Sequence, residues 1–379
     1  MLCRSRPEIS VHKRMRNMEM HRISWWRTDF GQAEIDRVSD SIRHEHISQG
    51  AVTALFEESL GKMLDVPYVV ATSSGSTALL MALMAINVGP GDEVIVPNRT
   101  WIATAHAPLL LGAKVVLIDV EADRPIIDVE QIEKLISPRT KAIMPVHLNG
   151  RAADLKAIRD IASCYGIRVI EDAAQAIGSR NADGLLGTQG DLGCFSLSVS
   201  KLISTGQGGF VVTRNEAFYR ELKSVRTHGV ADVVNADWTR LGFNFRFTDI
   251  LASIGLVQLA QLPERIAKVL AIYDMYEAAM KNMPHLQLVP VDIAGGEIPV
   301  YVEVLCPQRQ HLLTHLANND IDARPLYPDL DRAKYFNNAS AFPNSRKYGD
   351  DGVILPCGPG QSKENIKRVI KALEAFSIK

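Results

Sequence analysis

The sequence predicts an α/β protein with a mostly parallel β-sheet that is covered by helices on both faces. The first observation is an alternation, from about residue 68 to residue 213, of short apolar runs with segments of helical periodicity. The second is that these runs are continuously apolar, as expected of parallel strands that are buried on both faces. The third is that the pattern of apolar and helical segments changes after about residue 286, which predicts a smaller C-terminal unit.

The individual elements follow from the same periodicities. Apolar runs predict strands at 68–72, 93–97, 114–119, 142–146 and 168–171. Periodic segments between them predict helices at 76–86, 102–111, 129–136 and 155–165. Two further helices are expected at 248–262 and 266–283, with a bend at Pro263 between them. The C-terminal part predicts a strand at 298–305 and helices at 309–318 and 363–376.

The length of the chain limits the number of domains, and its charge limits the classes of partner. A chain of 379 residues allows two or three domains, and we predict a basic N-terminal extension (1–22), a large domain (23–262) and a linking helix with a small C-terminal domain (263–379). Lys and Arg number 42 against 43 Asp and Glu, so no global field attracts nucleic acid or an anionic membrane. Because the chain also lacks a long apolar stretch and a signal-peptide pattern, we expect neither nucleic acid nor a membrane as partner.

The cysteine and histidine patterns argue against disulfides and metals. The five cysteines are odd in number and none has CxxC spacing, which favours a reduced, cytoplasmic protein. The ten histidines show no HExxH spacing, so no metal site is expected. A Walker motif and a GxGxxG motif after a strand are both missing, which leaves nucleotide triphosphate and dinucleotide use unsupported.

Lys201 and Asp172 are the strongest candidates for catalysis. Lys201 follows the apolar run 193–199 and precedes a glycine-rich turn, and Asp172 ends the apolar run that begins at Val169. A pyridoxal phosphate enzyme needs a lysine for the Schiff base and an aspartate for the pyridinium nitrogen, held at neighbouring strand ends. The alternatives are a loop lysine on the surface and a helix N-cap at Asp172. Glu171 alternates to the other face and is expected to be structural.

A second set of residues is suited to holding such a cofactor. Gly75 and Ser76 begin a helix directly after a strand, where free backbone N–H groups and the helix dipole favour a phosphate. The flat ring of Trp101, which follows another strand, suits stacking on a pyridine ring, although most tryptophans are core residues. Trp25 and Trp26 are predicted to pack rather than to form a binding platform.

Seven segments in order resemble the DegT/DnrJ/EryC1/StrS family of sugar aminotransferases, over roughly residues 22 to 378. They are Ser74–Leu79, Thr100–Ala103, Pro145–Leu148, Glu171–Gln175, Ser196–Gly209, Asn244–Arg246 and Leu355–Gly360. The resemblance implies a fold type I enzyme: a mostly parallel seven-stranded sheet with helices on both faces, and a small C-terminal α+β domain. It also implies pyridoxal 5'-phosphate as cofactor, with pyridoxamine 5'-phosphate as its intermediate form.

The resemblance assigns further roles residue by residue. Lys201 shuttles a proton, Ser196 binds the cofactor phosphate, and Gln175 contacts the ring hydroxyl or the substrate. Asn244 reaches the phosphate of the neighbouring subunit's cofactor, which implies a homodimer with shared active sites. Candidate substrate contacts are His228, Arg246, Arg324 and Tyr327. At one position the chain departs from the family pattern, because Asn149 stands where tyrosine is frequent.

The implied reaction moves an amino group from L-glutamate to a nucleotide-linked keto-sugar in amino-sugar, O-antigen or other glycan biosynthesis. The Thr100–Ala103 segment favours a 4-keto-6-deoxyhexose, as in the perosamine-type branch; a 3-keto-sugar or a cyclitol is the alternative. Relatives that dehydrate sugars carry histidine in place of the lysine, so Lys201 argues against dehydration. A pyridoxal-binding sensor and a nucleotide-sugar binding module remain as other classes. The first would need a DNA-binding segment larger than residues 1–22, and the second would not need Asp172 and Lys201.

Overall fold

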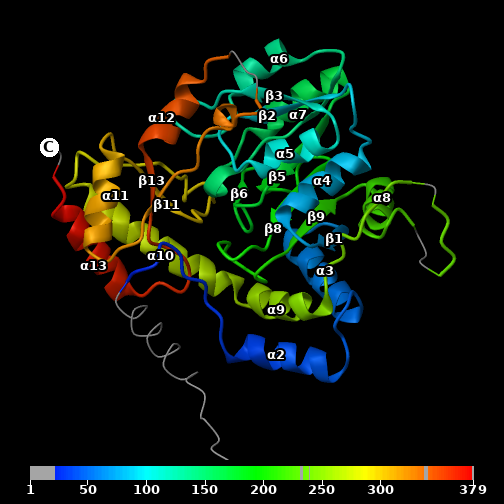
Figure 1. The fold of residues 1–379 in the computed structure, drawn as a ribbon, viewed down its shortest axis with the longest axis horizontal. Coiled ribbons are helices and arrows are strands. Elements are labelled where there is room, and N and C mark those ends of the chain that lie inside the picture. The colour runs from blue at the N-terminus through cyan, green and yellow to red at the C-terminus, as the bar shows by residue number, and fades with distance from the viewer. Residues whose placement is uncertain (1–21, 231–233, 239, 337–339, 378–379) are drawn as a thin grey trace, which may run out of the picture.

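The computed structural model describes residues 22–230, 234–238, 240–336 and 340–377. The predicted N-terminal extension therefore lies, apart from Arg22, outside the described residues. Within them, an α/β body occupies most of the molecule and a smaller group of C-terminal elements packs beside it (Figure 1). The predicted fold class is confirmed, while the division into domains at residues 22 and 262 stays a prediction.

The main sheet has seven strands. In spatial order they are β1 (Tyr68–Thr72), β9 (Gly209–Thr213), β8 (Leu192–Ser196), β5 (Arg168–Asp172), β4 (Thr140–Ile143), β2 (Glu93–Pro97) and β3 (Lys114–Ile118). The pairs from β8 through β5, β4 and β2 to β3 are all parallel. Strand β9 runs antiparallel to both of its neighbours, β1 and β8. Because β5 and β8 are parallel neighbours, their carboxyl ends meet at one edge of the sheet.

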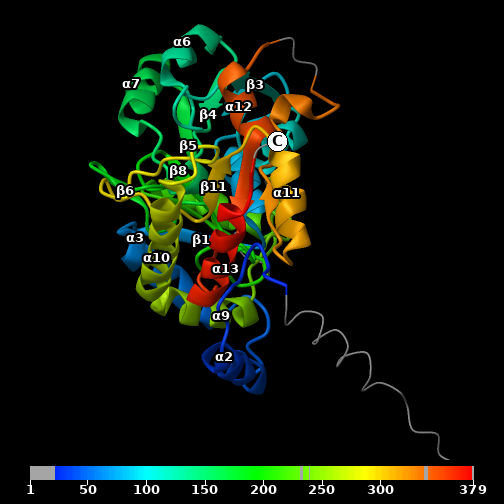
Figure 2. The same cartoon turned by 90° about the vertical axis from the view of Figure 1, so that its left-hand side faces the viewer.

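Helices cover both faces of this sheet because alternate strand residues enter different apolar clusters. Val70 of β1 packs with α4, α5 and α8, whereas its neighbours Val69 and Ala71 pack with α3 and α9. The helices of the large body are α2 (Gln32–Arg43), α3 (Ala51–Leu64), α4 (Gly75–Ala85), α5 (Ala103–Leu110), α6 (Ile132–Leu135), α7 (Leu155–Tyr165), α8 (Glu216–Arg226) and α9 (Asp249–Ala260). In both ribbon views α2 lies at the end of the molecule opposite α6 (Figures 1 and 2).

A second, antiparallel sheet organises the C-terminal part and is called the small sheet below. Its order is β10 (Gln287–Leu288), β11 (Val302–Leu305), β13 (Gly352–Leu355) and β12 (Arg324–Pro325). The helices associated with it are α10 (Leu262–Met280), α11 (Arg309–Asn318), α12 (Pro343–Asp351) and α13 (Lys363–Glu374). The remaining short elements are the hairpin β6 (Arg180–Asn181) and β7 (Gly184–Leu185), and the 3-10 turns η1 (Val129–Gln131), η2 (Leu148–Gly150) and η3 (Leu330–Arg332).

Several predicted elements differ from the structure. The helix expected at 129–136 is the 3-10 turn η1 followed by the short helix α6, and three further differences have a local reason. The strand expected at 142–146 is β4 at Thr140–Ile143, and Pro145 beyond it lacks the N–H that a continuing ladder needs. The strand expected at 298–305 shortens to β11 because the Tyr301 N–H binds the Asn149 side chain instead of a strand. The break expected at Pro263 between two helices falls at Gln261, which separates α9 from α10, and Pro263 lies in the first turn of α10, where proline is tolerated.

Candidate active site

Lys201 and Asp172 line one cavity at the carboxyl edge of the main sheet. Asp172 is the last residue of β5 and lies opposite Cys194 of β8, and Lys201 lies in the turn that follows β8. The cavity has a volume of about 740 Å³ and is bounded by both the main sheet and the small sheet, with Tyr301, Arg324 and Ile354 contributing from the latter side. The two residues that the sequence predicts to act together are therefore brought together.

The Asp172 carboxylate is buried with two hydrogen-bond donors in the protein. Its side chain accepts from the Thr104 hydroxyl at 2.7 Å and from the Ala174 backbone N–H at 3.1 Å. Burial raises the pKa of Asp172, while these two hydrogen bonds and the charge of Lys201 act in the opposite direction. A buried carboxylate with so few partners is stabilised by a cation, such as a protonated pyridine nitrogen.

The buried surroundings of the Lys201 amine favour its neutral form. Burial lowers the pKa of Lys201 to about 8, and the negative charge of Asp172 limits the decrease. The amine therefore carries a substantial neutral fraction near pH 7 to 8. A neutral amine is the form that attacks an aldehyde carbon, as covalent attachment of pyridoxal phosphate requires.

The start of α4 forms an anion cradle in the same cavity. Ser74 caps the helix by accepting from the Thr77 N–H, so that Gly75 and Ser76 occupy the first two helical positions, whose N–H groups lack partners within the helix. A Cβ atom on Gly75 would lie 2.8 Å from Cβ of Ser196 and 3.1 Å from its hydroxyl oxygen. The glycine thus keeps free a space that faces two amides and the hydroxyls of Ser76 and Ser196, which suits a phosphate.

These three features together fit pyridoxal phosphate. The group offers a protonated ring nitrogen for Asp172, an aldehyde for Lys201 and a phosphate for the α4 cradle, and all of these residues line the one cavity. The acid comes from β5, which is the parallel neighbour of β8. The cradle follows β1, which β9 separates from β8 in the sheet, and Gly75 at the start of α4 approaches Ser196 at the end of β8.

Trp101 and Gln175 also line this cavity. The Trp101 side chain is 57% exposed and meets the Tyr327 ring edge-on at 5.7 Å between centroids. The Gln175 side-chain oxygen accepts from the Asn149 N–H at 2.8 Å, which anchors one end of the amide beside the cavity. Both positions suit contact with a bound ring, and their contacts to the cofactor stay predictions.

Arg324 and Tyr327 line the side of the cavity that belongs to β12 and the segment after it. The guanidinium carbon of Arg324 lies 4.3 Å from the centroid of the Trp25 ring, an arrangement typical of a cation–π contact. Tyr327 packs against Trp101 and also lies over Arg99. Trp26 is buried as predicted, whereas Trp25 does more than pack, because it contributes to the cavity wall.

The structure does not bring Asn244, His228 and Arg246 into the cavity of the same chain. Asn244 is exposed and forms an isolated bridge with Thr227, and Arg246 forms one with Thr72 at the end of β1. His228 is exposed, with a φ of 57° in the left-handed region. Asn244 is expected to serve the neighbouring subunit's site rather than its own, so its role stays a prediction, as do the substrate contacts of His228 and Arg246.

Several residues around the site have no signal in the sequence. Thr104 bonds Asp172 from α5, and its place in the first turn of that helix gives no hint of a partner in β5. Tyr301 and Asn149 reach the site through contacts between residues more than one hundred positions apart. Asn149 stands out in the sequence as a departure from the family pattern, but only the tertiary contacts reveal what Thr104, Tyr301 and Asn149 do.

Glu171 is structural, as expected. It is fully buried and accepts from the backbone N–H groups of the 187–190 segment and from His147, at distances between 2.5 and 2.8 Å. These bonds tie the connection between β5 and β8 to the face of the sheet opposite Asp172. The rigid strand end that results holds Asp172 in place.

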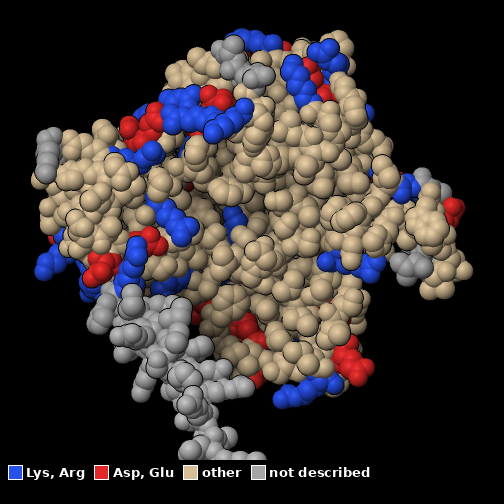
Figure 3. All heavy atoms as spheres, viewed as in Figure 1, with Lys and Arg blue, Asp and Glu red and all other residues tan. Residues whose placement is uncertain are grey.

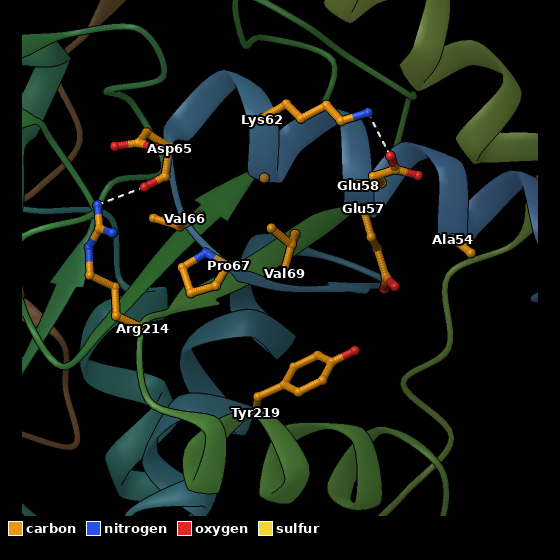
Figure 4. A pocket seen from close by; sticks show the side chains of 11 residues that line it. Ala54, Glu57, Glu58, Lys62, Asp65, Val66, Pro67, Val69, Arg214 and Tyr219 are labelled. Atoms are coloured by element: carbon orange, nitrogen blue, oxygen red, sulfur yellow. Dashed lines mark hydrogen bonds and ion pairs between the residues drawn. The ribbon is translucent and has the colours of Figure 1, made fainter.

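A second hollow of about 790 Å³ lies beside α3, β1 and α8 and shares no lining residue with the Lys201 cavity. Figure 4 shows Lys62 paired with Glu58 and Arg214 bonded to the Asp65 backbone on its rim. In the described part of the chain, no group of three or more His, Cys, Asp or Glu side chains could hold a metal ion. None of the described helices combines the length and hydrophobicity that crossing a bilayer requires.

Comparison with curated proteins finds relatives over most of the chain. Two proteins named GDP-perosamine synthase, from Caulobacter vibrioides and from Escherichia coli O157:H7, are each 33% identical to it. The first comparison covers 86% of this chain and 90% of the relative, and the second covers 87% and 91%. These matches therefore extend over most of the chain rather than over one motif.

Comparison with solved structures also finds similar proteins over most of the chain. DesV of S. venezuelae, determined with a ketimine intermediate, has a TM-score of 0.87 and 28% identity, over 93% of this chain and 98% of that one. The PLP-form of a sugar aminotransferase from Streptococcus pneumoniae has a TM-score of 0.88 and 25% identity, over 93% and 98%. The sequence model of the DegT/DnrJ/EryC1/StrS aminotransferase family matches residues 28–374. With the lysine, the acid and the phosphate cradle in one cavity, this chain belongs to that family and is a pyridoxal phosphate-dependent nucleotide-sugar aminotransferase.

Proposed function

We propose that the enzyme transfers the amino group of L-glutamate to the C4 carbonyl of a nucleotide-linked 4-keto-6-deoxyhexose. The convergence of Lys201 and Asp172 on one cavity carries the aminotransferase part of the proposal. The sugar is supported by the curated relatives, three of which are named GDP-perosamine synthase at 30–33% identity. A GDP-linked 4-keto sugar is therefore the first acceptor to test.

In this proposal the chain's own residues perform four tasks. The bound cofactor supplies an electron sink for the carbon that loses its proton. Lys201, neutral in part near pH 8, takes that proton from the donor's α-carbon and delivers one to the sugar carbon. Asp172 keeps the ring nitrogen protonated, and Gly75, Ser76 and Ser196 hold the phosphate. Trp101 and Gln175 contact the ring and orient it against the lysine.

We assign the substrate to the wall formed by Arg324, Tyr327 and Trp25. Arg324 is exposed at this wall, and its guanidinium suits either the donor carboxylate or the diphosphate of the nucleotide. The aromatic rings beside it offer flat surfaces for a sugar or a base. Trp101 borders the same wall through its contact with Tyr327.

We further propose a homodimer in which the segment after α8 completes the partner's active site. Asn244 is exposed and absent from its own cavity, and His228 and Arg246 lie on the same segment. The large apolar side chains Trp238, Leu241 and Phe243 are 65–87% exposed there, which suits burial against a second subunit. In Figure 1 residues 234–238, the described part of this segment between its two gaps, lie away from the body beyond α8.

We place the enzyme in the cytoplasm, in the synthesis of an amino sugar for O-antigen or another glycan. The cysteines within the described residues, Cys164, Cys194, Cys306 and Cys357, are all free, in keeping with a reducing compartment. Lysine, arginine, aspartate and glutamate are mixed over the face in Figure 3, which shows no broad basic area suited to nucleic acid.

The visible spectrum tests the proposed donor and acceptor separately. Purified enzyme with pyridoxal phosphate should show an absorbance band that L-glutamate converts to the pyridoxamine form, and a GDP-linked 4-keto-6-deoxyhexose should then restore the band. Restoration by a 3-keto sugar nucleotide instead would move the reaction to C3. A band that glutamate leaves unchanged would contradict the proposed donor.

Mixing two inactive variants tests the shared site. Subunits with Lys201→Ala and with Asn244→Ala should each be inactive or nearly so, and exchange between them should restore about a quarter of the activity, since half of the dimers would carry one complete site. If Asn244 acted within its own chain, mixing would restore nothing. Light scattering gives the oligomeric state of the same samples.

A further inference from the structure

The turn that carries Lys201 is tied to two aromatic side chains from other parts of the chain. The backbone carbonyl of Val199 accepts from Nε1 of Trp26 at 2.9 Å. The next carbonyl, that of Ser200, accepts from the Tyr301 hydroxyl at 3.0 Å. The last two carbonyls before the lysine are thus both fixed by side chains more than one hundred positions away in the sequence.

The two donors form one buried unit. The rings of Trp26 and Tyr301 pack edge to face with centroids 5.6 Å apart, and the two residues are 7% and 6% exposed. The Tyr301 ring also lies 5.9 Å from Nζ of Lys201. Burial raises the pKa of Tyr301, so the phenol keeps the proton that it donates.

Each donor is in turn fixed by the small sheet or its surroundings. Trp26 bridges with Cys357, the second residue after β13. The Cys357 N–H donates to the Trp25 carbonyl at 2.9 Å, and the Arg27 N–H donates to the Cys357 carbonyl at 3.1 Å. The buried Asn149 amide brackets Tyr301 by accepting from its N–H at 2.6 Å and donating to its carbonyl at 2.9 Å. This double contact gives a role to the asparagine that departs from the family pattern.

We propose that Trp26 and Tyr301 are positioning residues that hold the Lys201 turn, so that the small sheet fixes where the lysine amine points. Neither side chain needs to touch the reacting atoms, because each acts through a backbone carbonyl of the turn. A lysine must reach both the cofactor aldehyde and the carbon that exchanges a proton, and an error of about 1 Å in such a position costs about a hundredfold in rate. Without the two bonds the turn would sample more conformations.

The test uses full-length Tyr301→Phe and Trp26→Phe, which keep an aromatic ring and remove the donor. Tyr276→Phe is the matched control, because the Tyr276 hydroxyl donates to the Pro356 carbonyl at 2.9 Å in an equally buried place. Hydrogen exchange of the amides in residues 197–205 is measured in cofactor-free protein. Stopped-flow absorbance then gives the rate at which added pyridoxal phosphate becomes attached to Lys201.

Exchange in the turn should become about three to ten times faster in Tyr301→Phe and in Trp26→Phe, the loss expected for one hydrogen bond each. The attachment rate should fall with it. The maximal rate at which L-glutamate removes the visible band in a single half-reaction should also fall, while the glutamate concentration that gives half of that rate stays close to that of the wild type. Tyr276→Phe should change none of these. Equal effects in Tyr301→Phe and Tyr276→Phe would overturn the proposal. Because none of these measurements uses a sugar, the result does not depend on whether the proposed sugar acceptor is correct. If Trp26→Phe fails to fold, Tyr301→Phe alone decides.

Discussion

The hollow beside α3 and the cavity that contains Lys201 have similar volumes. Their charged side chains differ in whether they form an ion pair at the surface or are buried. In the hollow beside α3, the Lys62 ammonium pairs with Glu58 at 2.6 Å and both side chains are largely exposed. In the cavity at the sheet edge, Lys201 and Asp172 are desolvated, and their pKa values move away from ordinary values for that reason. Volume therefore does not identify the active site; burial of groups that converge from different strands does.

Lys201→Ala should have the largest effect on activity and gives the clearest contrast between the Lys201 cavity and the hollow beside α3. Removing the amine deletes both the covalent attachment and the proton transfer, so transamination should fall by at least about a thousandfold. The visible band that marks covalent attachment should vanish. Lys62→Ala is the matched change in the other hollow and should leave both the band and the rate as in the wild type.

Asp172→Asn should rank second. The neutral amide cannot stabilise a protonated ring nitrogen in a buried place, a loss of about 3 kcal/mol, or roughly a hundredfold in kcat. Asp65→Asn is the control beside α3, where φ is 52° and asparagine is well tolerated. Steady-state kinetics on both variants decide the point, and similar losses in the two would show that the Asp172 effect is structural.

The pH dependence of cofactor attachment should sharpen the comparison further. Because burial lowers the pKa of Lys201 to about 8, attachment to cofactor-free enzyme should slow about tenfold for each pH unit below 8 and level off above it. Exposed lysines titrate near pH 10.4 instead. Since the charge of Asp172 raises the pKa of Lys201, Asp172→Asn should move the profile to lower pH. A rate that still climbs beyond pH 10 would contradict the burial of the amine.

Thr104→Val should have the smallest effect. It removes the 2.7 Å hydrogen bond to Asp172 with little change in shape, and kcat should fall by about tenfold, near the lower end of the range for a hydrogen bond to a charged group because the Ala174 N–H bond to Asp172 remains. Thr53→Val is the control, because Thr53 makes a bond of the same length to Asp249 between α3 and α9. Thermal unfolding should show that both variants have a lower melting temperature than the wild type. Only Thr104→Val should also have a lower kcat.

The residues differ in how far the sequence could predict them. Lys201, Asp172, Gly75 and Ser76 lie next to strand ends, and strand ends are visible in the sequence because buried parallel strands are continuously apolar. The helix at Leu155–Tyr165 was predictable to the residue because Asp154 caps it and Gly166 ends it in the left-handed conformation. The strand expected at 298–305 failed because a side-chain contact of Asn149 replaced the ladder at Tyr301.

Residues that act through distant partners could not be predicted in the same way. Thr104, Tyr301 and Trp26 each make one decisive hydrogen bond to a residue at least 68 positions away, and no local pattern encodes such a pair. The first turn of α5 and the end of the 298–301 segment look ordinary in sequence. The small antiparallel sheet was only partly foreseen for a related reason, because β10 and β12 have two residues each.

The packing of Trp26 also constrains the order in which the protein can fold. Its partners lie at residues 199, 301 and 357, so the wall of the active site closes only after most of the chain has been synthesised. Contacts of such large sequence separation form slowly, because their loop-closure entropy is lost before they contribute. Cofactor capture is then a late event that adds its binding free energy to a nearly finished fold. A nascent chain ending before residue 301 would lack the Tyr301 and Cys357 contacts of Trp26, which makes this early tryptophan a reporter of completed folding.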